Sequence, residues 1–171
     1  MRDFSKISPA LWHSKRFNNL PSDDGRYLYL YLLTNEHQTS AGCYRLPDGY
    51  ATNDLSWELL RYVTARQELV AADLIFFDEL ESVVMITRWF QHNPPMSDSH
   101  FIGIERVLAK LPSQEIWKAA SQAANEAWES IQAAKLAKDI KSDKTPQGAS
   151  NGQQAAIPEL LQTRYLTSGR Q

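Results

Sequence analysis

The sequence contains a single cysteine, Cys43, among its 171 residues. One cysteine excludes an intramolecular disulfide framework and is typical of proteins from a reducing compartment. The chain also lacks any apolar run close to the roughly 18–20 residues that a membrane-spanning helix needs. Residues 1–17 have no apolar segment of the kind that signal peptides contain. We therefore expect a cytoplasmic protein that has no membrane partner.

Sequence motifs for catalysis and for metal binding are missing as well. The chain has neither a glycine-rich phosphate loop nor a Gly-x-Ser-x-Gly elbow, so nucleotide hydrolysis and serine hydrolase chemistry are not expected. Its four histidines and one cysteine are scattered, whereas a zinc site needs three or four converging ligands. The sequence predicts no enzyme activity, no catalytic residue, no metal, no cofactor and no small-molecule substrate.

Positive charge is scarce in the middle of the chain. Residues 22–93 contain five arginines and no lysine against eleven acidic residues, whereas residues 1–21 contain four basic residues and one acid. Neutralisation of phosphates supplies most of the non-specific affinity for nucleic acid, and an acidic core cannot supply it alone. Any binding of nucleic acid would therefore draw on the basic N-terminal segment, in particular on Lys15 and Arg16.

The order of the expected elements predicts the fold class. In the helix expected at about 58–72, four apolar residues recur with helical spacing and define a buried face: Tyr62, Ala65, Leu69 and Ala72. Three helices followed by a β-hairpin form the winged helix-turn-helix arrangement, so we expect a mainly α fold with a small hairpin. The expected elements are a helix over 8–17, a helix from 22 to 33, an edge strand at 43–46, a helix at 47–55 with Asp48 as its cap, a turn at 56–57, the helix at 58–72, and strands at 74–77 and 83–87.

The chain divides into a basic N-terminal segment over residues 1–21, a winged-helix core over 22–93 and C-terminal helices over 94–141. Residues 142–156 are poor in apolar side chains and predict a disordered linker. Residues 157–171 predict a short terminal helix or tail.

An alanine-rich helix over 113–141 dominates the C-terminal region. Its narrow apolar stripe of small residues, flanked by two tryptophans, indicates either a homodimer or partner interface, or a helix that folds back on its own domain. The candidate interface residues are Ile116, Trp117, Ala120, Ala127, Trp128 and Ile131.

Several segments together resemble a known family. They read SPALWHSKRFNNLPSDDGRYLYLYLLTN, AGCYRLPDGYATNDLSW, QELVAADLIFFD and RWFQHNPP. The combination resembles the N-terminal winged-helix domain of bacteriophage replication-initiation (replisome organiser) proteins found in prophages. The resemblance covers roughly residues 5–111, and its most specific parts are Gly42–Tyr44, Leu69–Asp78 and Trp89–Asn93. It implies binding of double-stranded origin DNA, with a C-terminal region that contacts other replication proteins.

In winged helices of this kind the third helix offers its outward face to the major groove. Arginine, lysine, asparagine and glutamine read base edges, and arginine and lysine contact phosphates. The acidic residues expected in the hairpin, from Asp78 to Glu81, oppose phosphate contact. The nucleic-acid-binding candidates are Lys15, Arg16, Arg61, Thr64, Arg66 and Gln67.

Two other functions fit the same residues. Leu60 and Val63 on the outward face of the third helix would suit a protein–protein interaction module that uses the scaffold without touching DNA. A transcriptional regulator of the same fold would have the same sequence features. The sequence leaves open which of the three functions applies, and which protein partners the chain has.

Overall fold

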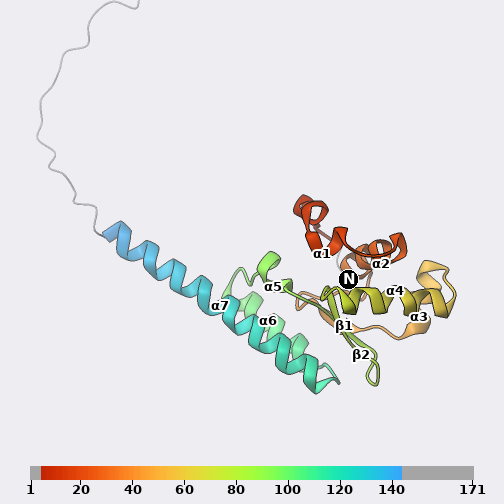
Figure 1. Ribbon diagram of the computed structural model, residues 1–171. Coiled ribbons are helices and arrows are strands. Elements are labelled where there is room, and N and C mark those ends of the chain that lie inside the picture. The colour runs from red at the N-terminus through yellow and green to blue at the C-terminus, as the bar shows by residue number, and fades with distance from the viewer. Residues whose placement is uncertain (1–4, 144–171) are drawn as a thin grey trace, which may run out of the picture.

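The computed structural model describes residues 5–143 (Figure 1). The expected linker beyond residue 143 and the terminal segment 157–171 lie outside the described residues. The helices are the 3-10 helix η1 (Pro9–His13), α1 (Lys15–Asn18), α2 (Asp23–Thr34), α3 (Asp48–Leu55), α4 (Leu59–Ala71), α5 (Trp89–His92), α6 (Asp98–Leu108) and α7 (Gln114–Asp143). The strands are β1 (Cys43–Arg45), β2 (Ile75–Asp78) and β3 (Val83–Ile86).

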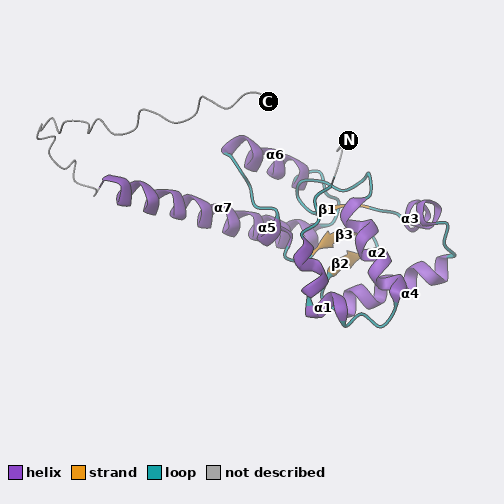
Figure 2. Ribbon diagram, turned by 90° about the horizontal axis from the view of Figure 1, so that it is seen from above, coloured by secondary structure: helices purple, strands orange, loops and turns teal. Residues whose placement is uncertain are grey.

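The three strands form one antiparallel sheet in the order β1-β3-β2. The hairpin register pairs Ile75 with Ile86 and Asp78 with Val83, and the short strand β1 pairs with the other edge of β3. Helices α2, α3 and α4 lie together beside this sheet (Figure 2). The chain order α2-β1-α3-α4-β2-β3 is that of a winged helix-turn-helix domain, with the β2–β3 hairpin as its wing. The predicted fold class is therefore confirmed.

The core lies between the helices and the sheet, and the predicted inward face of α4 lies in it. Tyr62, Ala65 and Leu69 are buried, and Ala72 packs against the same cluster from the end of the helix. These residues fall on one face because a helix repeats every 3.6 residues. α4 therefore contributes one face to the core and leaves the opposite face to the solvent.

The caps of the first helices differ in part from the expectation. Ser22, where the second helix is expected to begin, caps α2, since its Oγ accepts a hydrogen bond from the Gly25 amide at 3.0 Å. The helix expected over 8–17 is instead split into η1 and α1, because Ser14 between them has extended backbone and caps the second piece. Asp48 does not cap α3, whose cap position is Pro47.

The C-terminal helices form an antiparallel pair that follows the wing domain. α6 packs along the first half of α7, which also contacts α5 and β3. The second half of α7 projects away from the domain (Figures 1 and 2). Ser113 caps this helix, as its Oγ accepts from the Ile116 amide at 3.3 Å. None of the described helices combines the length and the apolar character needed to span a bilayer.

Candidate nucleic-acid interface

The turn between α3 and α4 orients the third helix of the domain. Ser56 ends α3 in the left-handed conformation, at φ 53°, and the amide of Trp57 donates back to the Thr52 carbonyl at 3.0 Å. This backbone turn is a left-handed helix end of the kind that satisfies the last carbonyl groups of a helix. After this turn α4 begins at Leu59.

The outward face of α4 is exposed and chemically mixed. Leu60 is 78% exposed, and Arg61, Thr64 and Gln67 are also exposed. Positions 60, 64 and 67 follow helical spacing and form one stripe, with Arg61 beside it. A guanidinium, a hydroxyl and an amide in one patch have the chemistry that reads base edges, and a leucine can contact a thymine methyl group.

Arg61 is held in position by two neighbours. Its Nε and one terminal nitrogen donate to the two Asp24 carboxylate oxygens at 2.7 and 2.6 Å, and its guanidinium lies 4.2 Å from the Trp57 ring centroid. The hydrogen bonds from Arg61 keep the pKa of Asp24 below its ordinary value, and the same contact raises the pKa of Arg61. The bidentate pair orients the guanidinium while half of its side chain stays exposed.

Arg66 was predicted as a DNA contact, and the structure contradicts that prediction. The residue is only 6% exposed, and its guanidinium pairs with the Asp48 carboxylate. The same group lies 3.9 Å from the Phe77 ring centroid and 3.7 Å from a Glu79 oxygen. Arg66 therefore connects α4 to α3 and to the wing. It falls on the inner side because it lies four residues after Tyr62 and three before Leu69, which are both buried.

Replacing Arg66 by alanine should lower the free energy of unfolding by about 1–3 kcal/mol, because Asp48 would lose its charged hydrogen-bond partner. Lysine should restore only part of this loss, since an ammonium cannot reproduce the planar contact with Phe77. Urea denaturation followed by circular dichroism measures the change. Arg106→Ala, at an exposed arginine of α6, is the matched control and should leave the midpoint unchanged. An unchanged midpoint for Arg66→Ala would contradict this structural role.

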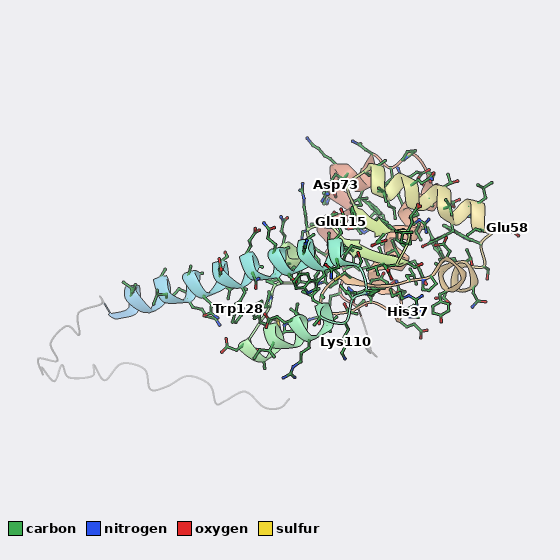
Figure 3. All side chains as sticks on the ribbon, turned by 90° about the horizontal axis from the view of Figure 1, so that it is seen from below. His37, Glu58, Asp73, Lys110, Glu115 and Trp128 are labelled. Carbon is green, nitrogen blue, oxygen red and sulfur yellow. The ribbon has the colours of Figure 1, made fainter. Side chains whose placement is uncertain are left out.

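The predicted basic segment packs on the domain at the far end of α4. Arg16 donates to the backbone carbonyl of Asp73 and, at 3.0 Å, to its carboxylate. Asp73 and Glu58 mark the two ends of α4 in Figure 3. Arg61 and Asp73 are therefore separated by about 18 Å along the helix, at roughly 1.5 Å per residue. Lys15 is exposed but lies with Arg16 at this distant end, so the two predicted basic contacts do not join the exposed patch of α4.

The wing is acidic at its tip, as expected. The Asp78 carboxylate accepts hydrogen bonds from the amides of Leu80 and Glu81 at 3.0 and 3.2 Å. Hydrogen bonds from Ser113 and then from the Glu81 amide lower the pKa of Asp78. The carboxylate therefore stays charged at neutral pH. A charged acidic tip cannot approach DNA phosphates closely.

The long helix α7 folds back on its own domain over its first half. Ile116 and Ala120 are buried against α6, α5 and β3, so the prediction that they meet another chain is wrong. Trp128 stacks on Phe101 of α6 with ring centroids 5.2 Å apart, and Figure 3 shows it beside α6. The remaining candidates are less covered: Trp117 is exposed, and Ala127 and Ile131 are half-buried.

Sequence reasoning did not find two charged residues whose neighbours are distant in the chain. The Asp24 carboxylate, in the first turn of α2, orients Arg61 from 37 positions away. Arg88 was not singled out, yet it is an exposed cation beside the segment that contains Lys15 and Arg16. Both relations are tertiary, and no local pattern marks them.

Metal and thiol chemistry find no support in the described part of the chain. Across residues 5–143 no three side chains of His, Cys, Asp or Glu gather as a metal ion would require. Cys43 is fully buried, and burial raises its pKa to about 12. It therefore remains a neutral, unreactive thiol at physiological pH.

The fold and the exposed third helix define a winged helix-turn-helix protein. A comparison of the chain with protein-family models, with curated proteins and with solved structures found no significant match. Function is therefore inferred from the residues and their geometry.

Proposed function

We propose that this chain is a cytoplasmic DNA-binding protein, not an enzyme, that acts in the initiation of DNA replication of phage type. The exposed patch of Leu60, Arg61, Thr64 and Gln67 on α4 carries this proposal. These residues lie on the helix that winged-helix proteins insert into the major groove, and Arg61 is on its N-terminal half, where base contacts concentrate. The replication role comes from the sequence resemblance.

The charges of the domain limit how this contact is made. Arg66 is buried, Arg16 and Arg61 are paired with Asp73 and Asp24, and the wing tip is acidic, so a single domain offers few cations to phosphates. Each phosphate contact adds to the dependence of affinity on salt. One domain is therefore expected to bind duplex DNA weakly and with a shallow salt dependence, and several domains together would be needed for stable occupancy.

A protein–protein interaction module is the second candidate, and a specific observation favours it. Leu59 and Val70 are 56% and 45% exposed on α4, in addition to Leu60. Exposed apolar side chains gathered on one helix are typical of an interface with another protein. In this alternative, Arg61 and its partner Asp24 form part of the polar rim of that interface.

DNA selection from a random duplex library, followed by fluorescence anisotropy on the selected duplex, tests the proposal. Arg61→Ala should weaken binding by about 1–3 kcal/mol and relax the preference at one position, because it removes a base contact. Gln67→Ala should change the preference at a neighbouring position. Arg106→Ala removes an exposed arginine far from α4 and should leave binding unchanged.

Two outcomes would count against DNA binding. One is that no duplex shifts the anisotropy of the parent protein even at low salt. The other is that Arg61→Ala and Arg106→Ala weaken binding equally, which would indicate unspecific attraction. Either result would leave the interaction module as the better account of the exposed face of α4.

A further inference from the structure

A cavity of about 540 Å³ opens beside the N-terminal segment, and no residue of α4 lines it. It lies between the N-terminal segment, α2, the base of the wing hairpin and α5. Its size is within the range of about 300–1,000 Å³ that is usual for ligand sites. The lining combines the cations Lys6, Lys15, Arg16 and Arg88 with apolar side chains such as Leu33 and Ile86.

The charge of the cavity differs from that of the chain. Four lysine or arginine residues and His92 line it, and none of the described residues 5–143 that line it is acidic, although the whole chain has a net charge of −2. The Asp73 carboxylate next to the cavity offsets the charge of Arg16 at 3.0 Å. Lys15 and Arg88 are exposed at the rim. The cavity therefore favours an anionic occupant that also has an apolar side chain.

Single-stranded nucleic acid fits this cavity poorly. Bases bind to proteins by stacking on aromatic faces. The two aromatic residues of the lining, Tyr29 and Trp89, are both 7% exposed, and the Trp89 indole donates to the Ser40 carbonyl at 2.9 Å. Their faces are taken up by the core, so an acidic protein segment is the better match.

The wing tip of this chain combines negative charge with an exposed apolar side chain. Leu80 is 94% exposed, and it stands between Glu79 and Glu81, which are exposed too. The hydrogen bonds to Asp78 fix the backbone of this turn, so Leu80 is presented in an ordered loop. A preformed loop loses less conformational freedom on binding than a flexible one.

We propose that the wing tip of one copy of this chain inserts into the cavity of a second copy. Leu80 would contact the apolar floor, and Glu81 would approach Lys15 and Arg88. The wing tip cannot enter the cavity of its own chain, because the tip and the cavity lie at opposite ends of the same hairpin. Four residues of β2 separate them by about 13 Å, at roughly 3.3 Å per residue.

The segment that follows α7 is a poorer occupant. Residues 144–171 contain three basic residues and one acid, so their charge has the same sign as that of the cavity. The wing tip, by contrast, has opposite charge and an exposed leucine. A tip-to-cavity contact is heterologous, so each copy can receive one neighbour and insert into another. The proposal is independent of DNA binding.

Light scattering coupled to size exclusion, without DNA, tests the proposal with two complementary variants. Leu80→Ser with Glu81→Lys removes the tip, and Lys15→Glu with Arg88→Glu reverses the charge of the cavity. The parent should show a mass above the monomer that rises with concentration and falls with added salt. Each variant alone should be a monomer. Their mixture should form a pair of twice the monomer mass, because one intact tip then meets one intact cavity.

Leu136→Ser is the matched control, because it removes a leucine that is 63% exposed on the projecting part of α7. It should leave the assembly of the parent unchanged. A monomeric parent at every concentration, a mixture that fails to pair, or an assembly lost only in Leu136→Ser would each overturn the proposal.

Cysteine cross-linking gives a second readout that does not depend on charge-reversed variants. Cys43 is fully buried, so newly introduced cysteines are the reactive ones. A chain with both Glu81→Cys and Lys15→Cys should form a ladder of covalent multimers on mild oxidation, resolved on a non-reducing gel. Each single variant should give at most a small fraction of dimer. A ladder no stronger than in the single variants would contradict the tip-to-cavity contact.

Discussion

Replacing Gly42 by alanine should lower the free energy of unfolding by about 2–5 kcal/mol. Gly42 has φ +69°, a conformation that L side chains rarely adopt, and an added Cβ would clash with the Trp89 ring. The indole cannot move aside easily, because it is buried and donates to the Ser40 carbonyl. Thermal and urea denaturation followed by circular dichroism measure the loss.

Gly49→Ala is the matched control for this substitution. Gly49 lies in α3, and a Cβ there would have no neighbouring atom within 4 Å. Alanine favours helix, so the control should be neutral or more stable by roughly 0.4–1 kcal/mol. Equal melting temperatures for the two variants would show that the Trp89 ring does not pack over Gly42 as described.

Leu69→Ala should destabilise the protein by about 2–5 kcal/mol, the usual cost of a cavity left by a buried leucine. Leu69 is fully buried near the end of α4, and its carbonyl accepts from the Leu74 amide at 3.0 Å as the chain turns into β2. The truncated side chain would leave a void between the third helix and the wing. The melting temperature and the urea midpoint measure this loss.

Leu60→Ala is the control for Leu69→Ala on the same helix. Leu60 is exposed, so its truncation creates no cavity and should change the stability by less than about 0.5 kcal/mol. If Leu69→Ala melted within a degree of the parent, the position of this residue in the core would be wrong. If Leu60→Ala were the more damaging of the two, the inward and outward faces of α4 would be reversed.

The fold could be predicted because local sequence patterns indicate most of its helices and strands. Tyr62, Ala65 and Leu69 recur with helical spacing, and Ser22 is followed by acids in the manner of a helix start. The split of the first helix at Ser14 was missed. Ser14 favours a cap over a helix interior, but the apolar residues on both sides of it read as one helix.

The candidate site could be predicted only in part, because charge in a sequence does not reveal its partners. Arg61 and Arg66 look equivalent along the chain, yet Asp24 orients the first at the surface and Asp48 holds the second inside. The apolar stripe of α7 was ambiguous for a similar reason. A stripe of small residues can pack against a helix of the same chain or of another chain. Here α6 of the same chain covers its beginning.

The burial of Arg66 also has a consequence for how this domain can diverge. Arg66 and Asp48 depend on each other, so a change at one of them calls for a compensating change at the other. The exposed residues of α4 do not depend on a buried partner, so each can change alone: Leu60, Thr64 and Gln67. Substitutions can therefore accumulate on the outer face of α4 while the fold stays the same. A count of arginines in the third helix consequently overstates what a domain of this kind has available for recognition.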